Sequence, residues 1–168
     1  MKGKEMKPIL KVVSLQLPTG LEVTNTTMLG NWLLNISITN PNDDYGINFI
    51  DQKLVISYEN NHLAKDVIGP FRMPKRNSTF VFVNVTTAPE TVVNKSILEK
   101  AEADRNSDRI LIFFVRINMR YEYVYPGYSN QEKMRLYCYD LKVQFGNDPK
   151  DKAELIEPEK INYAGTVL

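Results

Sequence analysis

Hydrophobic and polar residues alternate along most of the chain with a period of two, which is typical of strands with one buried face. In residues 32–38 every second residue is apolar, from Trp32 to Ile38. The longest such run places an apolar or aromatic residue at every odd position from Leu111 to Tyr125. Residues 78–87 are apolar on both faces at first, which indicates a buried strand end. Together the patterns predict strands near residues 13–17, 32–39, 45–49, 54–58, 78–87, 111–125 and 134–145.

The apolar positions change phase at two places in this pattern. Odd positions are apolar from Tyr45 to Phe49, and even positions are apolar from Leu54 to Tyr58. A second change of phase falls near Cys138 and Tyr139. Because a one-residue shift moves every side chain to the other face of a sheet, each change predicts a β-bulge or a break.

One segment has helical periodicity instead. Val93, Ile97, Leu98 and Ala101 recur at the spacing of one helix face, and Asn94 can cap the helix. We expect one short helix that begins at about Lys95 and ends at about Asp104.

These elements predict an all-β fold, namely an immunoglobulin- or fibronectin-III-like β-sandwich of seven to eight strands with one inserted helix. Pro- and Gly-bearing turns separate the predicted strands. Residues 147–168 are charged and contain proline, so we expect a C-terminal tail that frays or lies loosely on the surface.

Composition narrows the function classes. The chain has 168 residues, which suits one domain, and a net charge of +1, which gives no overall field for nucleic acid. Arg72, Lys75 and Arg76 form a small basic group that we interpret as a solvated turn. Cys138 is the single cysteine, so no intramolecular disulfide is expected. No apolar run is long enough for a membrane span, and the lysine-rich start lacks the apolar core of a signal peptide.

The residues that could carry chemistry favour a protein that is not an enzyme. His62 is the single histidine and lies in a polar turn, where a solvated side chain is the ordinary role. Cys138 lies in the middle of a strand without nearby cations, as a small buried thiol does. The paired acids Asp43 and Asp44 belong to a turn, and their spacing matches no calcium loop. We therefore expect no catalytic residue, no cofactor and no metal.

Five Asn-x-Ser/Thr sequons are present, which is more than composition predicts by chance. A β-rich fold also raises this number without any glycan, since strands favour threonine and turns favour asparagine. Asn77 is the best candidate because it lies in a predicted turn, whereas Asn94 would be engaged as a helix cap. The glycosylation candidates are Asn77, Asn25, Asn35, Asn84 and Asn94, and two of them, Asn35 and Asn84, would have to face outward from strands.

Tyrosines gather at the end of the longest predicted strand. In a hairpin of the last two long strands, Tyr121 would lie near Tyr137. Tyr123, Tyr125 and Tyr128 form a possible interaction face beside the Pro-Gly turn. Ordinary cross-strand packing with hydroxyl groups at the rim explains the same pattern. We expect Tyr121 to be buried and Tyr125 and Tyr128 to be exposed.

Four segments in a fixed order carry a family resemblance. They read ITNPND at residues 38–43, LVISYENNHLA at 54–64, GPFRMPKRNST at 69–79 and LYCYDLKVQF at 136–145. In this order they resemble the plant harpin-induced-like proteins, which are related to the non-race-specific disease resistance protein. The shared unit is the group 2 late-embryogenesis-abundant domain, here residues 8–146. Residues 120–133 depart from it, because the family often has a shorter hairpin with Trp and Gly there.

The resemblance implies a structural role for Asn40, Pro41 and Asn42, a fold signature whose side chains form Asx-type turns. It also implies a plant defence or stress-response glycoprotein whose domain faces the apoplast from the plasma membrane. Its anchoring segment is absent from this chain, so residues 1–7 would be a juxtamembrane segment or a start added for expression. A protein partner at the plasma membrane or cell wall is expected, and nucleic acid is not.

Two alternatives remain open from the sequence. The first is a lipid-binding or lipid-transfer module whose groove would be lined by Phe80, Phe82, Phe113 and Phe114. The second is a soluble cytoplasmic protein that protects against desiccation, which the lone thiol permits. A continuous apolar cavity would favour the lipid module, and a packed core with a tyrosine surface would favour protein or glycan partners.

Overall fold

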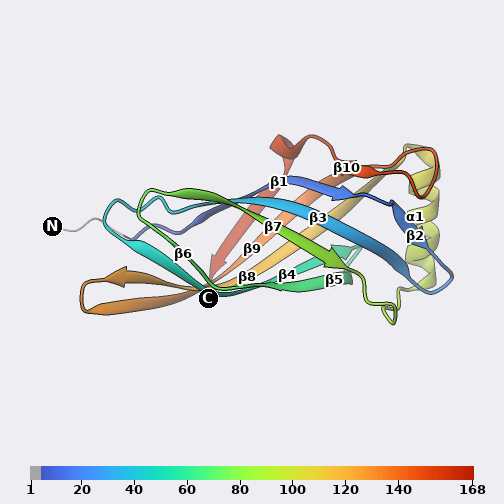
Figure 1. Cartoon of the computed structure of the whole chain (residues 1–168). Helices are drawn as coiled ribbons and strands as arrows, with labels where there is room; N and C mark the ends of the chain where they lie inside the picture. The colour runs from blue at the N-terminus through green and yellow to red at the C-terminus, as the bar shows by residue number, and fades with distance from the viewer. Residues whose placement is uncertain (1–4) are drawn as a thin grey trace.

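The computed structural model describes residues 5–168 and confirms an all-β sandwich with one helix (Figure 1). These residues form eleven strands rather than seven or eight, because three strands have only three residues and two strands lie in the predicted tail. The elements are β1 (Ile9–Leu17), β2 (Leu21–Val23), β3 (Met28–Thr39), β4 (Gly46–Tyr58), β5 (Asn61–Ile68), β6 (Phe71–Met73), β7 (Ser78–Thr86), α1 (Lys95–Ser107), β8 (Ile110–Tyr125), β9 (Tyr128–Gln144), β10 (Ala153–Leu155), the 3-10 turn η1 (Pro158–Lys160) and β11 (Asn162–Val167).

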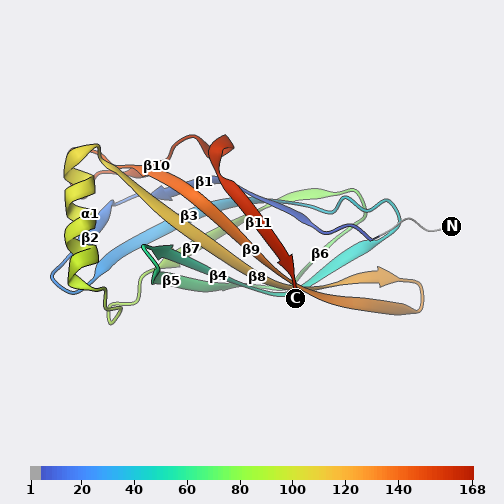
Figure 2. The ribbon, with the colours of Figure 1, turned by 180° about the vertical axis from the view of Figure 1, so that it is seen from behind.

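All strand pairs within the described residues are antiparallel. Strand β7 pairs with β3 and β3 with β1, which makes one half of the sandwich. The other half has the order β9-β8-β4-β5, with β6 also beside β4 and β11 beside β9. Short β10 pairs with both β1 and β9 and thereby joins the halves into one curled sheet (Figure 2).

The alternating apolar residues fill the space between the two halves. Trp32 of β3 meets Phe113 of β8 edge to face with ring centroids 6.2 Å apart, and Tyr58 of β4 lies 5.8 Å from the same ring. All three side chains are fully buried. Burial of each side chain of this size contributes about 1.5–3 kcal/mol, so the strand pattern alone accounts for a large core.

Both predicted changes of phase are β-bulges. The register of β4 against β8 shifts between Phe49 and Asp51, so Leu54 continues to face the core. In β9 the register shifts opposite Phe114, and Asp140 there has a φ of 63°. That left-handed backbone is one that Asp tolerates better than most residues.

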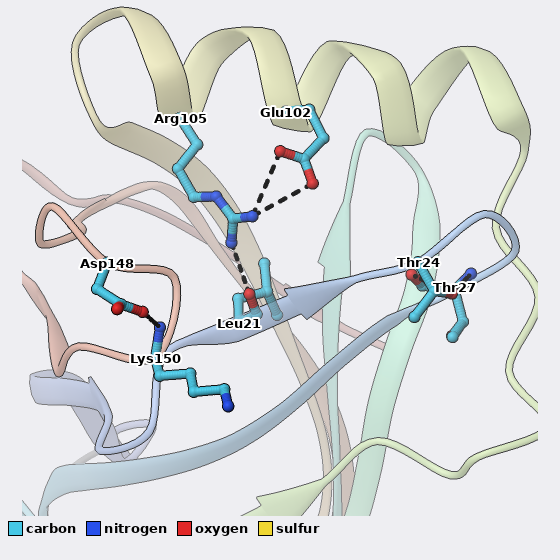
Figure 3. A network of polar contacts seen from close by, with 7 residues as sticks. All are labelled: Leu21, Thr24, Thr27, Glu102, Arg105, Asp148 and Lys150. Atoms are coloured by element: carbon cyan, nitrogen blue, oxygen red, sulfur yellow. Dashed lines mark hydrogen bonds and ion pairs between the residues drawn. The ribbon is translucent and has the colours of Figure 1, made fainter.

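Helix α1 starts where the sequence predicts and ends three residues later, at Ser107. The Asn94 side-chain oxygen accepts a hydrogen bond from the Ser96 backbone N–H at 2.9 Å, which confirms the cap. The extra turn contains Arg105, whose guanidinium donates to the Leu21 carbonyl at 2.5 Å and bonds Glu102 (Figure 3). Arg105 is 8% exposed, so this buried cation fastens the helix to β2.

The expectation that residues 147–168 fray is wrong. An Asp148 carboxylate oxygen accepts from the Lys150 N–H and orders the first turn of this segment (Figure 3). β11 then pairs with β9 over six residues, from Asn162 opposite Tyr139 to Val167 opposite Met134. No hydrophobic pattern predicted this strand, because all six of its residues are exposed and they show no apolar alternation.

Candidate functional site

The asparagine box, which we define as Asn40, Pro41 and Asn42, lies at the end of β3. Asn40 and Asn42 are 0% and 1% exposed, which is unusual for asparagine. The Asn40 amide donates to the carbonyl oxygens of Tyr45 at 2.8 Å and Pro74 at 3.2 Å. Its side-chain oxygen accepts from the backbone and side chain of Asn42, at 3.0 and 2.9 Å. The box therefore contains the expected Asx-type turn and joins two distant loops.

Asn42 holds the segment that leads into the domain. Its side-chain oxygen accepts from the Met6 N–H at 2.7 Å, and its side-chain nitrogen donates to the Met6 carbonyl at 2.8 Å. One amide side chain thus pairs with both backbone groups of one residue, as a neighbouring strand would. Tyr123 adds a hydrogen bond from its hydroxyl to the Met6 carbonyl at 2.9 Å. Of the predicted segment 1–7, residues 1–4 lie outside the described residues.

The tyrosines do not form one exposed face. Tyr121 is fully buried as predicted, and burial raises its pKa to about 12. Tyr123 is also buried, at 1% exposure, so its assignment to an interaction face is wrong. Tyr125 is half-buried, because its ring lies against Tyr45 and its hydroxyl bonds the Glu5 carboxylate. Only Tyr128 of the three candidates is truly exposed, at 65%.

The hairpin that carries these tyrosines is longer than predicted. Tyr125 pairs directly with Tyr128 across the two-residue turn of Pro126 and Gly127, and Tyr121 lies opposite Glu132 rather than Tyr137. The predicted register was wrong because β9 begins at Tyr128, in a polar stretch with no alternating apolar residues.

The structure places the five sequons in different settings. Asn25, Asn77 and Asn84 are exposed, and Asn84 faces outward from β7. Asn94 is exposed, but its side chain caps α1. Asn35 also faces outward but is half-buried in β3, between β1 and β7. The folded protein thus leaves most room for a glycan at Asn25, Asn77 and Asn84.

The four phenylalanines of the possible lipid groove do not meet. Phe113 is buried in the core beside Trp32. Phe80 and Phe82 point out from β7 and are 59% and 78% exposed, so the prediction that this strand end is buried is wrong. Phe114 lies on the outer surface of the other half, where its ring packs 5.8 Å from that of Tyr137. A groove lined by all four is therefore absent.

The residues considered for chemistry are separated. His62 is exposed in β5, whereas Cys138 is fully buried in β9, and burial raises the pKa of its thiol to about 12. Within residues 5–168 no three His, Cys, Asp or Glu side chains gather as a metal site requires. Arg76 of the basic turn forms an exposed ion pair with Asp43 at 2.6 Å, which agrees with a solvated turn.

A different group of polar residues, which the sequence analysis did not single out, lies on the outer surface of β9, β8, β4 and β5. We call Arg135, Arg116, Lys53 and Lys65 the cation row. Arg135 lies opposite Asn118, which lies opposite Lys53. Arg116 and Arg135 alternate with apolar residues in two predicted strands, which was the available signal, but Lys53 and Lys65 lie outside the predicted strands, and only pairing between strands brings the four together.

Comparisons with known proteins add little. No protein-family model and no curated protein matches the chain. A solved structure of a protein from Archaeoglobus fulgidus is 10% identical, covers 80% of this chain and 94% of its own, and has a TM-score of 0.36. A likeness of this size carries no argument about function. Among the described residues, no helix has the length and apolar character that crossing a bilayer requires.

Proposed function

We propose that this chain is the non-catalytic, extracytoplasmic interaction domain of a membrane-anchored plant defence or stress-response protein. The proposal begins from the resemblance of its four sequence segments to the harpin-induced-like proteins. Plasma-membrane attachment through an upstream helix, an apoplast-facing domain and a wall or membrane partner all belong to the proposal.

The observation that carries the proposal is the capture of Met6 by Asn42. In a domain displayed on a single upstream helix, the entering chain must be fixed if the domain is to keep one orientation. The asparagine box supplies that fixation at the end of the sandwich where Tyr123 also binds Met6. Helix α1 lies at the opposite end (Figure 1) and would point away from the membrane.

The exposed sequons give a second line of support. Asn25, Asn77 and Asn84 leave room for glycans in the folded domain. Oligosaccharide transfer occurs on the lumenal side of the secretory pathway, so occupied sequons would report the side of the membrane that the domain occupies.

The test is expression in plant cells of the chain behind one membrane-spanning helix, followed by glycosidase digestion and gel analysis. We expect a mobility shift on digestion, and Asn→Gln changes at Asn77 and Asn84 should each reduce it. The same chain without any targeting segment is the control and should show no shift. Two results together would overturn the extracytoplasmic placement. The anchored protein would show no mobility shift, and protease added outside the cells would cleave the domain only after the plasma membrane has been permeabilised.

The lipid-handling alternative loses the residues that suggested it, since they lie on two separate surfaces and in the core. The cytoplasmic alternative is decided by the same glycosidase experiment.

A further inference from the structure

The cation row has a regular geometry that the strand register defines. Arg135 lies on β9, Arg116 on β8, Lys53 on β4 and Lys65 on β5, so each cation is one strand further across the sheet. Arg116 lies opposite Val55, and Val55 lies opposite Lys65. Two of the cations therefore share one cross-strand line, while Arg135 and Lys53 share the next line.

These two lines make the row a zigzag. Neighbouring strands are about 4.8 Å apart, and diagonal neighbours on adjacent strands are about 7–8 Å apart. Each successive positive charge thus lies one strand further across the sheet. The charges alternate between the cross-strand line of Arg135 and Lys53 and that of Arg116 and Lys65. Long flexible side chains extend each charge beyond its backbone position, so a chain lying across the strands could reach all four.

The positive charges of the row are not neutralised within residues 5–168. Arg116, Lys53 and Lys65 form no ion pair with another described residue, and the Arg116 Nε is buried without a hydrogen-bond partner. Arg135 bonds only neutral groups, the Asn118 side-chain oxygen at 3.0 Å and the Tyr137 hydroxyl at 3.4 Å. The exposed ammonium groups of Lys53 and Lys65 are therefore available to an anionic ligand, and hydrogen bonds between charged groups are about twice as strong as neutral ones.

Two acids that flank the row are engaged, whereas Asp66, next to Lys65 on β5, is exposed and accepts only from the Val67 backbone N–H. Asp51, which follows on β4, forms an ion pair with Arg120 at 2.9 Å. Asp140, on the β9 bulge, accepts a hydrogen bond from the Asn162 side chain at 2.6 Å. The row thus has four cations and Asp66 as an adjacent free acid, so cations outnumber free acids there although the whole chain carries a net charge of only +1.

An aromatic group adjoins the row on β8 and β9. The ring centroid of Phe114 lies 5.8 Å from that of Tyr137 and 5.1 Å from that of Tyr139. Tyr139 is 42% exposed, and its neighbours are half-buried. Aromatic rings with hydroxyl groups at their tips suit ligands that combine C–H surfaces with hydroxyl groups, as sugars do.

We propose that the cation row and these three rings bind an anionic polysaccharide, specifically a polyuronate laid across the strands. In an extended polyuronate, successive sugars turn their carboxylates to opposite sides of the chain, which matches the zigzag of the cations. The choice of an acidic wall polymer rests on the proposed function, whereas binding itself does not.

The test is titration calorimetry of the full chain with short oligogalacturonate in calcium-free buffer. Fully methyl-esterified oligomer of the same length is the neutral ligand, and single-stranded DNA and phosphatidylserine vesicles are the other anions. We expect binding to the free acid alone among the sugars, and affinity that falls steeply as salt rises. DNA or vesicles that bind more tightly than the oligogalacturonate would overturn the ligand class.

The variant Lys53→Ala/Lys65→Ala should weaken oligogalacturonate binding at least tenfold. Its matched control is Lys11→Ala/Lys95→Ala, which removes two exposed lysines from elsewhere and should change affinity less than twofold. Arg116→Ala should weaken binding further, and Arg116→Lys should restore part of it. Equal losses in both double variants, or equal affinity for the methyl ester, would overturn the proposal. These results are independent of the glycosidase experiment, so binding and placement can fail separately.

Discussion

Two polar regions of this protein differ in burial and in whether their polar groups have hydrogen-bond or ion-pair partners. In the asparagine box, Asn40 and Asn42 are completely buried, and their amide groups bond backbone groups of Met6, Tyr45 and Pro74. In the cation row, Arg116 and its neighbours lie on an outer sheet surface, and most of their charges have no partner among the described residues.

The difference separates residues that build the fold from residues that are free to bind. A buried polar group that has all its hydrogen bonds stabilises one conformation and has no capacity left for a ligand. A group with unused donors gains when a partner arrives. A recognisable sequence motif did not indicate which region could bind a ligand. The Asn-Pro-Asn segment is a recognisable motif but stabilises the fold, whereas the cation row has no motif in the sequence.

The largest expected effect is on the free energy of unfolding of the box variant Asn40→Ala/Asn42→Ala. Several buried carbonyl and N–H groups would lose their partners, at about 1–3 kcal/mol each where water cannot replace them. We expect a loss of about 3–5 kcal/mol in urea unfolding. The control Asn106→Ala/Asn147→Ala changes two exposed asparagines and should cost less than about 0.5 kcal/mol. A box variant as stable as this control would show that the box is not structural.

The second expected effect is a fall in the free energy of unfolding at alkaline pH, which tests whether the buried ionisable side chains are buried as described. Burial raises the pKa of Cys138 and of Tyr121 to about 12 each, and raises that of Tyr123. These groups stay protonated in the folded protein while the unfolded chain releases their protons. Stability is therefore fully present below about pH 9 and falls as pH rises toward 12.

Urea unfolding from pH 7 to 11 measures this decline. In the variant Cys138→Ala the onset should move up toward pH 10, the ordinary pKa of tyrosine. A free energy of unfolding that is constant up to pH 11 would contradict the burial of these groups.

The two tyrosines at the hairpin tip, whose rings stack with centroids 4.5 Å apart, should differ in their contribution to stability. Tyr125→Ser removes the ring contact with Tyr45 and the bond to Glu5, so we expect a loss of about 1–2 kcal/mol. Tyr128→Ser removes a mostly exposed ring and its stack on Tyr125, so it should cost less, about 0.5–1 kcal/mol. Thermal unfolding of the two variants is the measurement. Equal losses would mean that both rings belong to the packed structure.

The smallest effect is expected for the stability of the cation row. Lys53→Ala/Lys65→Ala should change the free energy of unfolding by about 0.5 kcal/mol or less, since both side chains are exposed and unpaired. Chemical unfolding beside the unchanged protein gives the value. A loss above about 1.5 kcal/mol would place these lysines with the asparagine box, and the comparison between the two regions would fail.

The sequence by itself determined the elements that have strong local signals. Alternation located the long strands, the changes of phase located both bulges, and helical spacing with Asn94 located α1. These succeed because burial of one strand face and capping of one helix end are decided by residues close together in the chain.

Tertiary structure alone decided what depends on contacts between distant segments. β11 exists because β9 offers an unpaired edge, and its own exposed residues carry no apolar pattern. Tyr123 is buried because Met6 and the core cover it, although its spacing equals that of the less buried Tyr125. The cation row arises only when four strands are placed in register, because no local pattern records which side chains will stand beside one another across a sheet.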